Sequence, residues 1–197
     1  MLNVWLYSII SVLIVSILSL IGIFTLFLRE NHLKNSLLFL VSFSAGALFG
    51  DAFIHLIPEA FEDGLGIRLP LYILSGIMTF FILEKFIHWR HCHVPTSKKH
   101  PHPFAFTNLI GDGLHNFIDG LLIGGSYLVN IPLGIATTLA VILHEIPQEI
   151  GDFGVLLHAG LTKTKALFYN FISAILAILG AVIAILVGSN ISGFSTF

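Results

Sequence analysis

The chain is poor in charge: Lys, Arg, Asp and Glu make up 10% of its 197 residues, and 56% are hydrophobic. Soluble domains carry about 25% charged residues, so this composition excludes a soluble globule and favours a protein embedded in a lipid bilayer. The formal net charge of -2 provides no basic field for nucleic acid, and we expect no nucleic-acid partner. The single cysteine, Cys92, excludes an internal disulfide framework. No nucleotide-binding motif is present, so we do not expect the chain itself to hydrolyse ATP.

Long apolar runs dominate the sequence, and each is long enough to cross a bilayer as a helix. They are continuously apolar, whereas strands of a membrane barrel alternate in hydropathy. The first run is not followed by a cleavage site of a secretory signal, so it counts as a span. The sequence predicts an all-α integral membrane protein with one transmembrane domain over residues 1–197. Six transmembrane helices are expected, at about 4–28, 36–58, 69–88, 104–129, 132–158 and 166–188.

The longest connection, about residues 89–103, is rich in histidine, proline and lysine, which indicates a solvent-exposed loop between two sets of three helices. Lysine and arginine are concentrated in the connections that lie on the same side of the membrane as this loop, if six helices cross in turn. Only Arg68 lies in a connection on the other side. The positive-inside rule therefore places the His-rich loop in the cytoplasm and the N-terminus outside. We expect a multi-pass protein of a plasma (inner) membrane, because the chain is compact and shows no large extracellular domain.

Two of the apolar segments carry polar side chains where the bilayer should be. A charged side chain at that depth costs about 2.5–3.5 kcal/mol, so such groups are expected to face a cavity, a partner or a cation. His115 and Asp119 stand four residues apart, as do His144 and Gln148, so each pair can converge on one ion. Imidazole, carboxylate and amide ligands without thiolate favour a first-row divalent cation. The candidate metal residues are His115, Asn116, Asp119, His144, Glu145, Gln148, Glu149 and Asp152.

Further polar residues extend this set toward both faces of the membrane. His55 and Glu59 form a stripe near the outer face, and Asp112 lies nearer the cytoplasm than His115. Asn170 is a second-rank candidate, with helix packing as its alternative role. In the loop, His91 and His93 either capture metal or belong to a solvated linker. Together, these residues offer candidate metal ligands at successive depths, from the outer face of the membrane to the cytoplasmic face.

These motifs resemble those of the ZIP family of divalent-metal transporters. His115-Asn116-Phe117-Ile118-Asp119-Gly120 matches the helix 4 motif of the family, and residues 144–152, HEIPQEIGD, resemble the helix 5 signature of its metalloprotease-motif-like branch. Helix 2, with Asp51, His55, Pro58 and Glu59, and the stretch from Leu83 to His93 are similar as well.

The resemblance implies a transporter of divalent transition metals into the cytoplasm, zinc foremost, then iron or manganese, with no prosthetic group. His115, Asp119, His144 and Gln148 would line the main transport site, and Asn116 and Glu145 would join an adjacent one. Gln148 stands where the eukaryotic signature usually has histidine, and the chain has six expected helices where the family has eight, so the last two would be missing. The bilayer and the metal ion are the expected partners, and a homodimer is left open.

Two other functions compete with transport. His144-Glu145 resembles the start of the His-Glu-x-x-His motif, in which glutamate activates a zinc-bound water, so an intramembrane zinc metallohydrolase is the main alternative. Gln148 occupies its closing position, and Pro147 distorts that turn, so we predict that the chain is not an enzyme. A membrane scaffold or metal sensor that transports nothing is the third hypothesis.

Overall fold

A computed structural model describes residues 1–27, 39, 41–43, 45–50, 52–62, 64–91 and 104–189. The side chains of residues 24–27, 55, 56, 59 and 87–91 are outside this description, although their backbone is within it. The described residues are helical or lie in turns, with no strand among them, which confirms the all-α class.

Among the described residues, four helical segments are long and apolar enough to cross a membrane: Leu2–Ile23, Arg68–Phe86, Ile131–His158 and Lys163–Gly188. Helix α5 (Phe104–Val129) has 26 residues and is therefore also long enough, but it is not among the four. Its polar residues, Asp112, His115, Asn116 and Asp119, lower its mean hydropathy. A helix that carries four candidate ligands is therefore the one that hydropathy alone overlooks.

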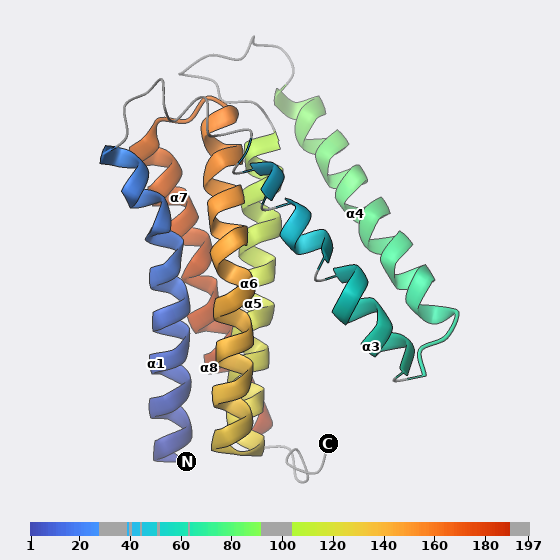
Figure 1. Cartoon of the computed structure of the whole chain (residues 1–197), viewed down its shortest axis with the longest axis vertical. Helices are drawn as coiled ribbons and strands as arrows, with labels where there is room; N and C mark the ends of the chain where they lie inside the picture. The colour runs from blue at the N-terminus through green and yellow to red at the C-terminus, as the bar shows by residue number, and fades with distance from the viewer. Residues whose placement is uncertain are drawn as a thin grey trace.

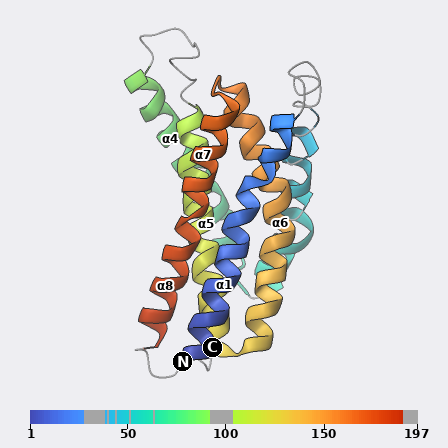
Figure 2. The same ribbon diagram turned by 90° about the vertical axis from the view of Figure 1, so that its left-hand side faces the viewer.

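A bundle built from α1 (Leu2–Leu18), α5, α6 (Ile131–His158), α7 (Lys163–Ala174) and α8 (Leu176–Gly188) forms the body of the molecule (Figure 1). α7 and α8 follow one another along one line past α5, separated by a turn at Ile175 (Figure 2). The expected segment 166–188 is thus one helical path with a break. The expected segment 4–28 also changes character, since α1 gives way at Ser19 to a 3₁₀ helix, η1 (Ser19–Phe27).

Glycines bring α5 and α8 close together. A Cβ atom added at Gly120 would lie 1.9 Å from the carbonyl oxygen of Ala177, and one added at Gly180 would lie 2.1 Å from that of Phe117. The backbones are thus in direct contact, as small residues allow between membrane helices. This packing holds one face of α5 against α8 and leaves another face for α6.

A separate arm lies beside the bundle, made of a π-helix, η2 (Ala52–Leu56), the short α3 (Ile57–Glu62) and α4 (Arg68–His91) (Figure 1). η2 and α3 cover the end of the expected segment 36–58; residues 36–38 lie outside the described residues. Only 6% of the apolar part of α4, within Arg68–Phe86, is buried. Its side chains are therefore largely free to contact lipid. The arm meets the bundle where Phe80 of α4 packs on Gly111 of α5, with a ring carbon 2.9 Å from an added Cβ.

Candidate metal centre

Four side chains from α5 and α6 converge at one point: His115, Asp119, His144 and Glu145 each offer a ligand atom, and these atoms lie within 4.8 Å of one another. The Nε2 atoms of His115 and His144 are 3.3 Å apart. Asp119 Oδ2 lies 3.4 Å from His115 Nε2 and 3.2 Å from His144 Nε2. Glu145 Oε1 lies 3.2 Å from His115 Nε2 and 3.9 Å from His144 Nε2. We call these four residues the imidazole–carboxylate cluster.

The local sequence explains why these residues meet. α5 ends at Val129, α6 begins at Ile131, and Asn130 between them caps α6 by accepting a hydrogen bond from the Leu133 amide at 2.8 Å. In such a tight antiparallel hairpin, residues equally distant from Asn130 lie at the same depth. His115 precedes Asn130 by about as many residues as His144 follows it, so the two imidazoles face each other. Asp119 follows His115 by one helical turn and therefore lies on the same face.

The two carboxylates of the cluster are buried, and its two imidazoles are partly exposed. Glu145 is 0% exposed and Asp119 is 3% exposed. The ion pairs that these two carboxylates form within the described residues are all with histidine. Neither Oε atom of Glu145 makes a hydrogen bond of good geometry. Two buried carboxylates whose charged partners among the described residues are histidines alone would be stabilised by a bound cation, because buried negative charge at this depth is strongly unfavourable.

The distances suit a small divalent ion. Ligand atoms about 2.0–2.1 Å from a tetrahedral zinc lie about 3.3–3.4 Å from each other. Four of the separations in the cluster fall between 3.2 and 3.4 Å. Imidazole with carboxylate is a ligand set used by zinc and other first-row divalent metals. Most of the separations therefore fit such an ion, and the pair His144 Nε2–Glu145 Oε1, at 3.9 Å, would have to close slightly around it.

The remaining candidates lie beside the cluster in hydrogen-bonded pairs. Asn116 donates from Nδ2 to Asp112 Oδ1 at 2.8 Å, and Ser173 of α7 donates to the other oxygen of Asp112. Asn170 donates to Glu149, which is 0% exposed. The structure therefore brings four of the candidates together and places Asn116, Glu149, Asp112 and Asn170 in adjoining contacts.

Asp152 has a partner that sequence reasoning missed. Asn108 of α5 donates from Nδ2 to Asp152 Oδ1 at 3.0 Å. Asn108 precedes Asp112 by four residues, and this spacing was the signal that could have identified it. Ser173 was missed as well; it lies three residues after Asn170, on the same side of α7.

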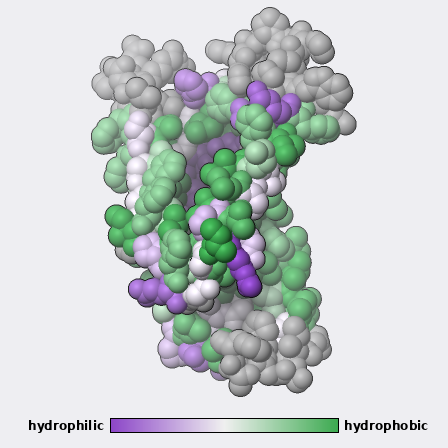
Figure 3. Space-filling model, turned by 90° about the vertical axis from the view of Figure 1, so that its right-hand side faces the viewer, coloured by the Kyte–Doolittle hydropathy of each residue, from purple (hydrophilic) through white to green (hydrophobic). Residues whose placement is uncertain are grey.

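A cleft of about 680 Å³ opens beside the cluster, between the arm and the bundle. Phe80 and Glu84 of α4 line one wall, and the other wall includes His115, Gln148 and Asp152. On the face of the molecule that carries the arm, hydrophilic residues are visible in a hollow between apolar ones (Figure 3). Gln148 is 8% exposed and lies in this cleft, next to the cluster.

Four second-rank candidates cannot be placed in this site. The side chains of His55, Glu59 and His91 lie outside the described part of the chain, and so does the whole of His93.

Comparison with known proteins gives a consistent set of relatives. A family model described as ZIP zinc transporter matches residues 2–106 and 102–196. The metal cation symporter ZIP14 of Xenopus tropicalis is 30% identical over 263 residues, covering 96% of this chain and 57% of the relative. Zinc transporter ZIP13 of Pongo abelii is 36% identical over 169 residues, covering 78% and 48%. Zinc transporter zipt-7.1 of Caenorhabditis briggsae is 27% identical over 248 residues, covering 96% and 63%.

The chain thus spans between 48% and 63% of the length of these curated relatives. No solved structure matches it.

Proposed function

The chain belongs to the ZIP zinc transporter family, and on this premise we propose that it carries divalent transition-metal cations, zinc foremost, across a membrane into the cytoplasm. The observation that carries the proposal is the convergence of His115, Asp119, His144 and Glu145, whose ligand atoms lie within 4.8 Å of one another. In this proposal the cluster, together with Gln148, holds the transported ion at its deepest point. Asn116, Glu149 and Asp152 bind it or its waters next.

The path through the bilayer follows from the positions of these groups. His55 and Glu59 collect the cation near the outer face, and the ion loses water to the imidazole–carboxylate cluster. It then passes along the cleft, beside Gln148, Asp112 and Asp152, toward the cytoplasm and the histidines at 91 and 93. Conduction needs ligands that dehydrate the ion and still release it, and weak oxygen ligands such as Gln148 serve this purpose.

Alternating access is proposed to come from movement of the helix bundle against the arm. α4 is little buried and meets the bundle through Phe80, whereas α5 and α8 are in backbone contact. The cleft between arm and bundle would close on one side of the cluster and open on the other as the two bodies shift.

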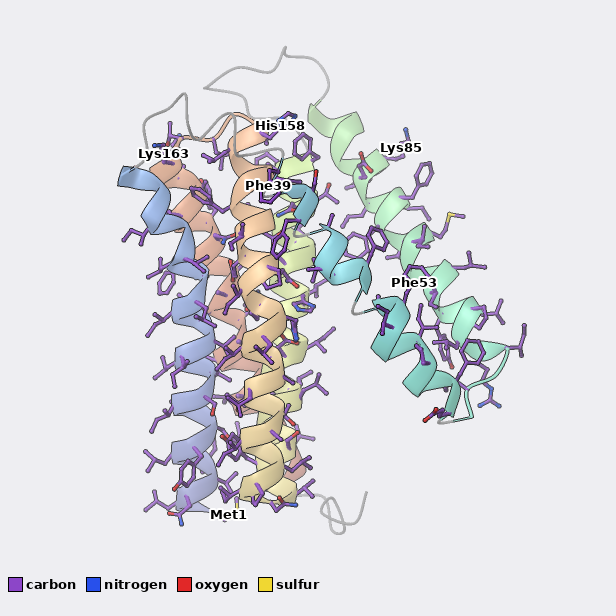
Figure 4. The ribbon with its side chains drawn as sticks, viewed as in Figure 1. Met1, Phe39, Phe53, Lys85, His158 and Lys163 are labelled. Carbon is purple, nitrogen blue, oxygen red and sulfur yellow. The ribbon has the colours of Figure 1, made fainter. Side chains whose placement is uncertain are left out.

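The proposed topology is a single transmembrane domain over residues 1–197 with six crossings and the N-terminus outside, in a plasma membrane. Lys85 and Lys163 lie at one end of the molecule, with His158, and Met1 lies at the opposite end (Figure 4). This arrangement supports a cytoplasmic end that carries the lysines. Residues 36–58 and α5 would supply the two crossings beyond the four found by length and hydropathy.

The test is metal flux into proteoliposomes that contain the purified chain. Zn²⁺, Fe²⁺, Mn²⁺ and Cd²⁺ are supplied outside, and a fluorescent chelator inside reports entry. We expect flux of Zn²⁺ that His115→Ala and His144→Ala each reduce by about 100-fold. Asn3→Leu, at an exposed position on α1, is the control and should transport as the natural chain does. Equal flux in liposomes with and without the protein would refute transport by this chain.

Gln148→His tests which ligands set the choice of ion. Imidazole binds zinc more strongly than an amide oxygen does, so this substitution should lower the KM for Zn²⁺ more than the KM for Mn²⁺. A KM ratio identical to that of the natural chain would remove Gln148 from the ion path.

A family of zinc transporters does not favour the metallohydrolase alternative. The same proteoliposomes separate the two, because a hydrolase would cleave lipid or peptide substrates and leave the metal gradient intact. A scaffold or sensor would bind metal without flux, and its binding would still require His115 and His144.

A further inference from the structure

A second group of polar side chains lines the cleft at a different depth from the imidazole–carboxylate cluster. Asn108 and Asp112 of α5 face Asp152 and Gln148 of α6, and all four line the cleft. Asn108 precedes Asn130 by as many residues as Asp152 follows it, and the same is true of Asp112 and Gln148. The hairpin thus places Asp112 with Gln148, and then Asn108 with Asp152, at successive depths beyond His115 and His144. Asn108 lies seven residues from His115, about 10 Å along the helix axis.

One carboxylate oxygen in this group lacks a donor among the described residues. Asp152 accepts from Asn108 through Oδ1 at 3.0 Å, but its Oδ2 atom is buried and has no hydrogen-bond partner. The hydroxyl oxygen of Thr107, which also lines the cleft, is buried without a partner as well. A buried carboxylate oxygen can only accept, so its missing partner is a proton donor or a cation. Asp152 itself lines the cleft, which provides the route by which a hydrated cation would arrive.

The ligand chemistry of this group differs from that of the imidazole–carboxylate cluster. Asn108, Asp112, Gln148 and Asp152 offer only carboxylate and amide oxygens, and none of them is an imidazole. Sites of oxygen alone suit manganese, calcium and magnesium, whereas imidazole raises the affinity for zinc, iron and copper. An ion that moves from the first group to the second exchanges strong nitrogen ligands for weaker oxygen ligands, which favours its release.

We propose that Asn108, Asp112 and Asp152, with Gln148 at the boundary, form an oxygen-only cation site between the imidazole–carboxylate cluster and the cytoplasm. Asn108 is its positioning residue, because its amide holds one oxygen of Asp152 and leaves the other directed at the ion. The site receives the divalent cation after the cluster has dehydrated it and sets how fast the ion leaves. This inference rests on the proposed transport function, which assigns the cleft to the ion path.

The experiment measures Mn²⁺ and Zn²⁺ binding separately in the purified full chain in nanodiscs. Free Mn²⁺ is counted by electron paramagnetic resonance, and Zn²⁺ binding is followed by competition with a fluorescent chelator. Asn108→Leu should weaken Mn²⁺ binding by about tenfold, as loss of a ligand-orienting partner does, and leave the Zn²⁺ affinity within about twofold. Asn108→Gln, which keeps an amide donor at this position, should retain more Mn²⁺ binding than Asn108→Leu does. The double variant His115→Ala/His144→Ala should show the opposite pattern, with Zn²⁺ binding lost and Mn²⁺ binding retained.

Asn3→Leu is the matched control, because it makes the same substitution at an exposed position of α1. If Asn108→Leu does not fold, Asp152→Asn gives the same test while it keeps the shape of the side chain. Equal loss of Mn²⁺ and Zn²⁺ in these variants, or no loss of Mn²⁺ binding, would overturn the oxygen-only site. Because the readout is binding, it is distinct from a failure of transport, which would appear as absent flux in the natural chain.

Discussion

The imidazole–carboxylate cluster contrasts with a second buried polar group in the same bundle, the hydroxyl cluster of Ser11, Tyr127 and Thr138. Ser11 Oγ and the Tyr127 hydroxyl are 2.9 Å apart, and Thr138 Oγ1 donates to the Gly134 carbonyl at 2.7 Å. Hydroxyl groups both donate and accept, so these three residues satisfy one another across α1, α5 and α6. The carboxylates of the other cluster can only accept, and Glu145 is left without a good donor. The hydroxyl cluster is complete by itself, whereas the imidazole–carboxylate cluster is the one that a cation would complete under the transport proposal.

Zinc-dependent stability is the largest effect that we expect from this contrast. Zn²⁺ at 100 times its Kd should stabilise the natural chain by about 2.7 kcal/mol, because it binds the folded state. A chelator should remove that gain. Thermal unfolding in detergent, followed by circular dichroism with and without Zn²⁺, measures it. In His144→Ala the melting temperature should not respond to Zn²⁺, and a full response there would show that zinc stabilises the chain elsewhere.

Glu145→Gln should separate stability from binding in one substitution. The amide has the shape of the carboxylate but no charge, so it removes from the metal-free protein a buried charge that only histidines oppose among the described residues. We expect the metal-free chain to gain about 1–2 kcal/mol of stability, as relief of a functional site often does, while Zn²⁺ affinity falls. Melting temperature and Zn²⁺ titration on the same sample check both halves. A loss of metal-free stability would mean that Glu145 is already well paired.

Tyr127→Phe should produce the opposite result in the hydroxyl cluster. It removes the hydroxyl that contacts Ser11 and Thr138, so Ser11 Oγ loses its partner and Thr138 keeps its bond to the Gly134 carbonyl. Hydrogen bonds between membrane helices average about 0.6 kcal/mol, so the loss of two should destabilise the chain by about 1 kcal/mol. Zn²⁺ affinity should remain unchanged, which titration of the variant measures. A change in Zn²⁺ affinity would show that the two clusters are coupled and would contradict the contrast between them.

Thr138→Val should have the smallest effect. Its contact with the Tyr127 hydroxyl is long, at 3.4 Å, and its other bond is to a carbonyl of its own helix. We expect a loss of about 0.5 kcal/mol in the same thermal assay. A loss larger than that of Tyr127→Phe would mean that Thr138, and not Tyr127, is the centre of the hydroxyl cluster.

The contrast also explains which parts of the site could be predicted from the sequence. The spacing of His115 with Asp119 marks one helical face, and the short connection at Asn130 places the helix of His144 next to it, so their meeting follows from local pattern. Glu145 was assigned to an adjacent site, but it lies in the cluster itself, 3.2 Å from His115. Adjacent residues on a helix point about 100° apart, and only the packing angle between α5 and α6 decides which of them reaches the shared point.

Contacts between distant helices were beyond pattern reasoning. The bond from Ser173 to Asp112 joins α7 to α5, 61 residues earlier, and that from Asn170 to Glu149 joins α7 to the preceding helix α6, 21 residues earlier. Asn170 also donates to the carbonyl of Ser19, where α1 changes to the 3₁₀ helix. Hydropathy predicts neither these contacts nor the change of helix type at Ser19. It measures how strongly a segment prefers lipid and does not tell which helix each face of the segment contacts.

The sequence by itself determined that the chain lies in a lipid bilayer and is all-helical. It also determined which segments are polar and what chemistry the candidate metal ligands have. These properties depend on composition and on the 3.6-residue period of a helix, which are local. Only the tertiary structure decided that Glu145 joins the imidazoles, that Asn108 holds Asp152 and that a cleft reaches both. Those outcomes depend on how α5 is rotated between α6 and α8, and that rotation is set by the backbone contact at Gly120 and Ala177, across more than fifty residues of chain.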